Sequence, residues 1–274
     1  MAGPKYGQID HDYGLRLATT PPDKDGPIWM VNLMKYHDVA QYADNSSQKI
    51  SGREADNLYT PLEPLAAIGA EIVYVGDVET KLLGDYRNWD RIAVVKYPTR
   101  RSFIDMQQRK DFKEKHVHKE AGMQETIVMG CLPVAHSTTE ISATDWEDVS
   151  HPPSEDDGPI AVLHVLKFGP ETRMDETPPD MEKYQEKAAE VALKNGLRIS
   201  GWFGVEGTIV GDGRKWDQVR FNTFPSKAAF MEVVSDPNRL EAQKIHREKA
   251  IADTYTMIVR TSLDNIAAST EPLG

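Results

Sequence analysis

The chain has 274 residues, enough for two domains of ordinary size or one large one. Its 39% hydrophobic and 27% charged residues are ordinary for a soluble globular protein, and the formal net charge of −11 argues against nucleic acid or an anionic membrane as a partner. The sequence has neither an apolar run of ~20 residues nor an N-terminal secretion signal, and its single cysteine, Cys131, excludes an internal disulfide. We therefore expect a cytoplasmic protein without membrane or nucleic-acid partners.

The first half of the chain predicts four strands with helices between them. Residues 1–25, rich in glycine and proline, are expected to form an arm over the fold. The predicted elements then follow in this order: strand 27–36, polar loop 37–53, helix 54–68, strands 71–78 and 89–97, helices 98–106 and 111–122, and strand 126–134. Pro61 and Pro64 should break or kink the helix at 54–68, because proline removes a helical hydrogen bond.

The second half predicts the same order of elements. A linker at 136–157, rich in Ser, Thr, Asp, Glu and Pro, separates the halves. The elements after it are a strand at 158–168, a helix at 181–194, strands at 197–210 and 216–224, helices that begin at 225 and 236, and a strand at 254–261.

The similarity of the halves extends to individual residues at a nearly constant separation. Both first strands are apolar runs that begin with Gly-Pro and end with Lys and an aromatic residue, at 26–36 and 158–168. Further matched pairs are Glu79 with Glu206, Trp89 with Trp216, Phe103 with Phe230, and His118 with His246. The chain is therefore interpreted as an internal duplication.

Each copy reads strand–helix–strand–strand–helix–strand, the split βαβ pattern of ferredoxin-like domains. The predicted fold class is α+β, with two ferredoxin-like βαββαβ modules packed sheet to sheet as an intramolecular α/β barrel. The expected domains are an N-terminal arm, a first module, the linker, a second module and a C-terminal tail, at 1–25, 26–135, 136–157, 158–263 and 264–274.

Four runs resemble domain-of-unknown-function family 1330: VNLMKY at 31–36, KYPTRRSF at 96–103, FPSKAAFM at 224–231 and HREKAIAD at 246–253. That family belongs to the dimeric α/β-barrel superfamily, in which two four-stranded sheets enclose a pocket, usually between two chains. The resemblance implies that one chain supplies both halves here, and it implies no particular reaction. The first copy departs from the pattern, because Lys119 stands where the second has Arg247.

One position of the repeated first strand differs in kind, with Asn32 in one copy and His164 in the other. Strand alternation places each of them among apolar residues on one face. If that face lines the interior of the barrel, the two residues are isolated polar side chains in an apolar chamber, which is the composition of small-ligand sites. Alternatively, His164 is a core histidine satisfied by a neighbour. As a base, neutral imidazole could take a proton, while Asn32 could donate a hydrogen bond to an oxyanion.

The remaining candidate residues occupy matched places in the two copies. His118 and His246 are either cations at helix C-termini or acid–base groups at a pocket mouth. The other candidates are expected to contact substrate: Glu79, Glu206, Trp89, Trp216 and Arg247. The glutamates are alternatively solvated strand ends, and the tryptophans are alternatively core residues.

The sequence gives little support for a metal or a cofactor. His116 and His118 are spaced i, i+2 and would point to different sides of a helix, and one cysteine cannot build a thiolate site. Gly211-Asp212-Gly213 fits a hairpin turn better than a phosphate loop. Some two-module members of the superfamily bind haem through a histidine, but resemblance to those enzymes is absent. We therefore expect no metal and no cofactor.

These observations favour a cofactor-free enzyme of lyase or isomerase type, acting by histidine acid–base catalysis on a small, largely apolar, oxygenated molecule. Two alternatives stay open, a cofactor-independent monooxygenase and a ligand-binding barrel without turnover. The substrate, the module that holds the pocket, and the formation of a homodimer are also left open.

Overall fold

The structure, a computed structural model, describes residues 4–43, 49–134, 144–169 and 176–271. The chain divides into two compact units, each built from three separate segments. Unit 1 comprises Met1–Val75, Asn88–Leu132 and Glu206–Lys215, and unit 2 comprises Gly76–Arg87, Pro133–Val205 and Trp216–Gly274.

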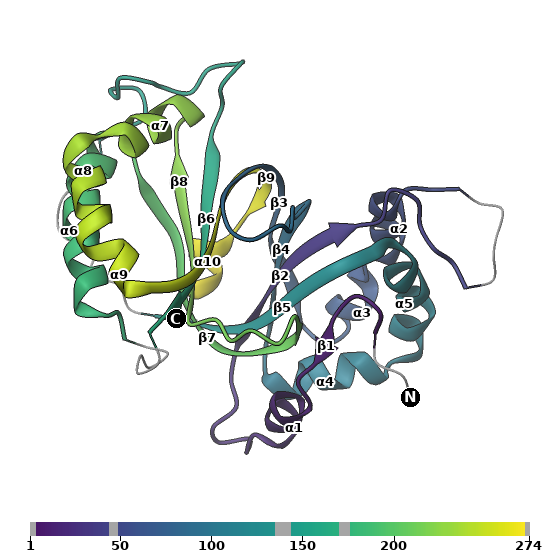
Figure 1. The fold of residues 1–274 in the computed structure, drawn as a ribbon. Helices are drawn as coiled ribbons and strands as arrows, with labels where there is room; N and C mark the ends of the chain where they lie inside the picture. The colour runs from purple at the N-terminus through teal and green to yellow at the C-terminus, as the bar shows by residue number, and fades with distance from the viewer. Residues whose placement is uncertain (1–3, 44–48, 135–143, 170–175, 272–274) are drawn as a thin grey trace. The chain divides into compact units, whose positions relative to one another are not determined.

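Unit 1 places a layer of helices on one face of an antiparallel sheet (Figure 1). The sheet follows the order β1-β7-β5-β2-β4-β3. The elements of the first half are β1 (Gln8–Ile9), α1 (His11–Thr19), β2 (Ile28–Tyr36), α2 (Gly52–Tyr59), α3 (Leu62–Ala66), β3 (Glu71–Leu83), β4 (Arg91–Tyr97), α4 (Arg100–Gln108), α5 (Lys110–Gly122) and β5 (Met123–Pro133).

Unit 2 repeats this arrangement around β6. Its strands follow the order β3-β9-β6-β8, and β8 also pairs with β7. The elements of the second half are β6 (Ile160–Phe168), α6 (Pro179–Lys194), β7 (Arg198–Gly211), β8 (Gln218–Phe224), α7 (Lys227–Ser235), α8 (Pro237–Ala242), the π-helix η1 (Gln243–Arg247), α9 (Glu248–Ala250), β9 (Ile251–Asp264) and α10 (Ile266–Thr270).

Two long strands each belong to both units. Strand β3 begins in unit 1 and continues in unit 2 from Gly76, while β7 begins in unit 2 and continues in unit 1 from Glu206. The hydrogen-bonded order therefore runs β7-β5-β2-β4-β3 in unit 1 and β3-β9-β6-β8 in unit 2, where β8 also pairs with β7. The predicted fold class, α+β with two βαββαβ modules, is confirmed.

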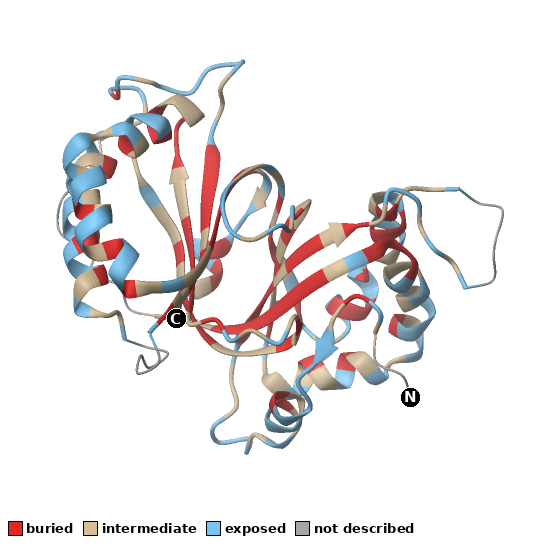
Figure 2. Ribbon diagram, viewed as in Figure 1, coloured by how far each residue is buried: buried red, intermediate tan, exposed pale blue. Residues whose placement is uncertain are grey.

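The central strands β2 and β6 have the same burial pattern along their length. In both, every position is buried except the fifth and the eighth, which are half-buried, and Figure 2 shows the strands of both units as largely buried. The fifth positions are Asn32 and His164, and the eighth are Lys35 and Lys167. The polar interruptions that differ between the copies therefore lie at equivalent places in the fold.

The helix that follows the third strand of each copy begins in the same way. Thr99 accepts a hydrogen bond from the Ser102 amide at 3.0 Å, and Ser226 accepts one from the Ala229 amide at 3.0 Å. These side chains satisfy amide groups that a helix N-terminus leaves without intrahelical partners. The local sequence signal, Pro followed by Thr or Ser, thus fixes the start of both helices.

Several boundaries differ from the prediction. The helix expected at 54–68 is two helices, α2 and α3, separated at Thr60 and Pro61, as the prolines indicated. Strand β3 extends to Leu83, because its second part pairs in unit 2, which a local hydrophobic pattern does not reveal. Trp89 precedes β4 rather than beginning it.

The predicted domain boundaries stay a prediction. Parts of the expected arm, linker and tail lie outside the described residues. Within the described residues, the arm contains β1 and α1, and the tail contains α10.

Candidate functional site

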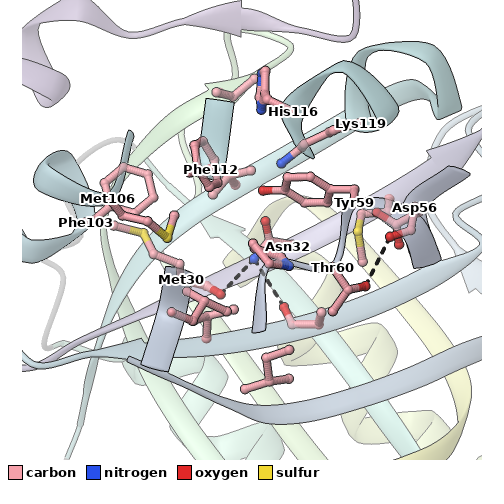
Figure 3. Close-up of a pocket in the computed structure, with 18 of the residues that line it drawn as sticks. Met30, Asn32, Asp56, Tyr59, Thr60, Phe103, Met106, Phe112, His116 and Lys119 are labelled. Atoms are coloured by element: carbon pink, nitrogen blue, oxygen red, sulfur yellow. Dashed lines mark hydrogen bonds between the residues drawn. The ribbon is translucent and has the colours of Figure 1, made fainter. Parts of the chain in front are cut away.

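A cavity of about 170 Å³ lies within unit 1, between its sheet and its helices (Figure 3). Strands β2 and β4 supply residues on one side, including Met30, Asn32 and Ala93. Helices α2 to α5 supply residues on the other. The face that bears Asn32 is therefore covered by helices of its own unit.

The walls of the cavity are mostly apolar. Met30, Phe103, Met106 and Phe112 are all buried and belong to one hydrophobic cluster that joins sheet and helices. The cluster also includes Tyr13 of α1, so the arm packs into the core of unit 1. An apolar cavity with few polar groups is the usual composition of a small-molecule site.

Asn32 presents its carboxamide oxygen to the cavity. Its Nδ2 donates to the Met30 carbonyl at 2.9 Å and to the Ala93 carbonyl at 3.4 Å. Both partners are acceptors, so the nitrogen must face them and the oxygen must face away. That oxygen has no donor among the described residues. In this orientation Asn32 offers an acceptor to a ligand, and its role as a donor to an oxyanion stays a prediction.

Lys119 of α5 is a cation of the cavity, and Arg91, which also lines it, is paired with Asp56. The Lys119 ammonium lies over the rings of Tyr59 and Tyr6, 5.2 and 5.7 Å from their centroids. Burial lowers the pKa of Lys119, and the nearby Asp56 carboxylate partly opposes that shift. No carboxylate among the described residues forms an ion pair with this ammonium, so its charge is available to a ligand.

Tyr59 of α2 also lines the cavity, beside Lys119 (Figure 3). Burial raises the pKa of its phenol well above the usual value, so the hydroxyl stays protonated. Among the described residues this hydroxyl has no hydrogen-bond partner. Tyr59 is therefore a neutral donor next to a cation.

His116 lines the cavity one helical turn from Lys119. Its Nε2 is 3.2 Å from the Tyr6 hydroxyl, and its Nδ1 is buried without a hydrogen-bond partner in the described part of the chain. Burial, and then the Lys119 charge, lower the pKa of His116 to about 4. The imidazole is therefore neutral near pH 7, which is the state that can accept a proton.

Asp56 supports one end of the cavity. Its Oδ2 accepts hydrogen bonds from the Tyr36 hydroxyl at 2.6 Å and from Arg91 at 3.1 Å. The carboxylate is 5% exposed, and a buried carboxylate requires such partners. Asp56 thus holds α2 against β2 and β4, and thereby holds Tyr59 in place.

The principal histidine of the sequence prediction, His164, lies in unit 2. Its Nδ1 is 3.2 Å from the Thr256 hydroxyl. Burial, followed by the charges of Arg247, Arg220 and Arg239, lowers the pKa of His164 to about 3, so it is neutral, as predicted for a buried imidazole. His164 and Arg247 lie close enough to interact electrostatically, but neither lines the cavity of unit 1.

His118 and His246 are half-buried, and each has a different partner. His118 Nδ1 is 2.7 Å from the Tyr42 hydroxyl in unit 1, while His246 Nδ1 is 2.9 Å from an Asp180 oxygen in unit 2. Neither histidine lines the cavity. Their predicted role as acid–base groups stays a prediction.

Glu79 and Glu206 form equivalent ion pairs with the first residue of a helix. Glu79 contacts Lys227 at 2.6 Å and also pairs with Arg260, and Glu206 pairs with Arg100. The hydrogen bond from Lys227 lowers the pKa of Glu79 despite its partial burial. The structure therefore brings neither glutamate to His118 or His246.

Trp89 and Trp216 are both 3% exposed. Trp216 packs against Tyr255 with ring centroids 5.4 Å apart, and neither tryptophan lines the cavity. Their predicted contact with substrate stays a prediction, while their burial is what the core alternative implies.

The sequence reasoning missed most of the cavity. Phe112, His116 and Lys119 follow one another at i, i+4 and i+7 on α5, and that helical spacing was the available signal. Tyr6 carried no such signal, because it lies in the arm and reaches the cavity only through tertiary structure. Asp56 and Tyr59 lie on the helix that the prediction treated only as a proline-broken segment.

The described part of the chain contains no group of three or more His, Cys, Asp or Glu side chains arranged to hold a metal ion. It also contains no helix both long and apolar enough to cross a membrane.

The fold is shared with solved structures at low sequence identity. An anthrone oxidase-like protein is 11% identical, with a TM-score of 0.52, and the match covers 92% of this chain and 98% of that one. A chlorite dismutase variant from Candidatus Nitrospira defluvii is 10% identical, with a TM-score of 0.50 and coverage of 94% and 99%. A protein of unknown function from Rhodopseudomonas palustris is 22% identical over 48% of this chain and 98% of its own, with a TM-score of 0.42.

The first two similarities show a shared fold and nothing of activity. No family model matches the sequence, and no curated protein matches it. Membership of family 1330 therefore stays a prediction.

Proposed function

We propose that the protein is a cofactor-free enzyme whose unit 1 cavity binds a small, largely apolar, oxygenated molecule and catalyses proton transfer on it. The observation that carries the proposal is the cavity itself, where Lys119, Tyr59 and the Asn32 oxygen face a mostly apolar space. Perturbed ionisable groups in an apolar pocket are the usual marks of a site that handles protons.

The volume limits the size of the ligand. An apolar cavity of about 150 Å³ in another protein binds benzene, and this one measures about 170 Å³. The space therefore suits a molecule of about one six-membered ring with one or two oxygen substituents. Met30, Phe103 and Met106 would contact its apolar part.

In this proposal each polar group of the cavity has a separate role in the reaction. Lys119 and the Tyr59 hydroxyl stabilise negative charge that develops on a carbonyl oxygen of the substrate. The Asn32 oxygen accepts a hydrogen bond from a substrate hydroxyl and so orients it. His116 is the base, and the proton reaches its Nε2 through the Tyr6 hydroxyl, which lies 3.2 Å away.

Removal of a proton next to a carbonyl is a first step common to isomerisation, to elimination and to oxygenation of the resulting carbanion. Lyase or isomerase chemistry is our preferred interpretation, because it needs no second reactant. A monooxygenase would in addition consume oxygen, so an oxygen electrode separates these reaction classes. Activity should survive exhaustive chelation, and a Soret band in the purified protein would contradict the cofactor-free proposal.

The test uses two probes of the expected size. Phenol should bind to the cavity and raise the thermal stability of the protein in a saturable way. Cyclohexanone in D₂O should exchange its α-hydrogens faster in the presence of the protein, as followed by NMR. Lys119→Met should abolish the acceleration while leaving the apolar walls intact, and Arg260→Met in unit 2 serves as the control. Binding of phenol without any exchange would favour the non-enzymatic alternative, and absence of both would contradict the proposed site.

A further inference from the structure

A second group of unusual side chains lies in unit 2, away from the residues that line the unit 1 cavity. Arg220 and Arg247 are only 5% and 6% exposed, and Arg239 and His164 lie close by. Within the described residues, Arg220, Arg239 and Arg247 have no carboxylate partner. Buried arginine is ordinarily paired with an acid, so this arrangement requires an explanation.

The strand register places the group on one face of the sheet. His164 on β6 is directly opposite Arg220 on β8, and Trp202 on β7 is opposite Arg220 on its other side. Side chains of directly opposed residues project from the same face of a sheet. On β6, His164 lies between Val162 and Leu166, both of which pack in clusters that include helix residues, so this face is the one covered by helices.

Arg220 is held by neutral groups. It donates from Nε to Gln218 Oε1 at 3.0 Å and from one terminal nitrogen to Gln185 Oε1 at 2.6 Å. Its guanidinium also lies 3.9 Å from the centroid of the Trp202 ring. These contacts fix the position and orientation of the guanidinium but leave its charge without compensation.

Arg247 is buried and has no hydrogen bond among the described residues. Its guanidinium carbon lies 5.9 Å from the centroid of the Tyr184 ring, and that of Arg239 lies 5.8 Å from the same ring. Arg239 is engaged, donating from Nε to the Tyr184 hydroxyl at 3.2 Å. The donors of Arg247 are therefore unused at a buried position near Arg220 and Arg239, and the Glu248 carboxylate opposes their charge without forming an ion pair with Arg247.

An anion would resolve this electrostatic problem. Burying a cation without a partner is costly, and an oxyanion near the guanidinium groups would offset both the desolvation and the mutual repulsion. The guanidinium donors match the oxygens of a carboxylate or a phosphate. Burial, and then the charge of Arg247, lower the pKa of Arg220 well below its usual value, which is consistent with an uncompensated cluster.

We propose that Arg247 and Arg220 form a binding site in unit 2 for a small oxyanion, either a carboxylate group or a phosphate. Arg247 supplies the free donors, and Arg220, fixed by Gln218 and Gln185, supplies a second positive charge. The neutral His164 imidazole is the group next to Arg220 on the sheet, where it can contribute an N–H donor.

The proposal is tested by anion-dependent stability of the full chain. Thermal unfolding is measured in separate titrations with sodium acetate and sodium phosphate, with chloride used to hold the ionic strength constant. Specific binding predicts a saturable rise in Tm. A response to acetate identifies a carboxylate site, a response to phosphate identifies a phosphate site, and either supports the proposal.

Arg247→Met distinguishes a ligand site from a structural arginine. Without added anion this variant should be at least as stable as the wild type, because an unpaired buried charge is replaced by an apolar group of similar length. The rise in Tm with the anion should be lost. Arg260→Met is the control, since it breaks a pair with Glu79 in the same unit and should keep the anion response.

If the methionine variant fails to fold, Arg247→Lys is used instead. It keeps the positive charge but lacks the planar set of donors of a guanidinium, so it should fold and show a smaller rise in Tm with the anion. The proposal is overturned if neither anion raises the Tm of the wild type. It is also overturned if Arg247→Met retains the full rise in Tm with the anion. Where Arg247→Met does not fold, the same result for Arg247→Lys overturns it.

Discussion

Units 1 and 2 use the same βαββαβ order to place different side chains at equivalent positions. In unit 1, Asn32 on the central strand is opposite Ala93, and in unit 2 His164 is opposite Arg220. A methyl group therefore stands in one copy where a buried guanidinium stands in the other. In unit 1 the result is an apolar cavity that contains Ala93 in its wall.

The helices of the two units also place different basic side chains at matched positions. Lys119 of unit 1 lies over two aromatic rings and faces the cavity, while Arg247 of unit 2 lies near Arg220 and Arg239, with the Glu248 carboxylate partly opposing their charge. The two units thus share their order of strands and their helix starts, while the polar side chains of their interiors differ. The site residues of one unit therefore cannot be assigned by matching them to those of the other.

The largest expected effect comes from transferring the unit 2 residue into unit 1. Ala93→Arg should abolish phenol binding, because a guanidinium would fill part of the cavity and repel Lys119. Isothermal calorimetry measures the loss, and circular dichroism confirms that the variant is folded. Ala93→Ser, which adds a single atom, should retain binding, and retention of full affinity by Ala93→Arg would show that the ligand does not occupy this cavity.

A second variant pair compares the neutral histidines of the two units. His116→Gln should slow the exchange of cyclohexanone by about 10²–10⁴-fold, the usual contribution of a general base. His164→Asn, which restores the residue of the first copy, should leave the rate close to that of the wild type. The opposite pattern, with His164 essential and His116 dispensable, would support the assignment made from the sequence alone.

The same histidines should make stability depend on pH. In the unfolded chain each titrates near 6.5, while in the folded protein the pKa of His164 is about 3 and that of His116 about 4. As the pH is lowered, the histidines therefore take up protons in the unfolded state before they do so in the folded state. Their contribution to the free energy of unfolding is complete above pH 6.5 and is lost as the pH falls toward the folded-state pKa values.

Between pH 6 and pH 5, His164 should lower the free energy of unfolding by about 1 kcal/mol per pH unit. Urea unfolding at pH 7, 6 and 5 measures it. His164→Asn should show a shallower decline than the wild type, and an unchanged slope would mean that His164 is not buried in its neutral form.

The smallest expected effects concern features that the copies share. Thr99→Ala and Ser226→Ala each remove a helix N-cap and should cost about 1 kcal/mol. Ser226 should cost more, because its hydroxyl also donates to the His151 carbonyl at 2.7 Å and the residue is 1% exposed. Urea unfolding of both variants checks this order, with Thr99→Ser as the conservative control. A larger loss for Thr99→Ala would contradict it.

Sequence reasoning identified the fold because its signals are local and occur twice. The Gly-Pro start of β2 and β6, the Thr and Ser caps, and the proline break near Pro61 each act over a few residues. The exchange of strand segments through β3 and β7 could not be predicted, because it depends on which distant strand completes each sheet.

The site was predicted less well for a related reason. Asn32 was identified because it interrupts an apolar strand, but its orientation depends on the Ala93 carbonyl, which comes from another strand. Tyr6 reaches the cavity from the arm, and no periodic pattern connects it with His116. Glu79 and Glu206 were matched as equivalents from the sequence, but their partners Lys227 and Arg100 come from distant segments that the sequence pattern does not connect with them.

The most direct test of the central claim is where an oxygenated ring binds. With ¹³C-labelled methionine methyl groups, unit 1 reports through Met30, Met34 and Met106, which line the cavity, and unit 2 through the buried Met181 and Met257. Titration with phenol should shift the resonances of the first three and leave the last two unchanged, and Ala93→Arg should abolish those shifts. Shifts confined to Met181 or Met257, or no saturable shift at all, would contradict the assignment of the ligand site to unit 1.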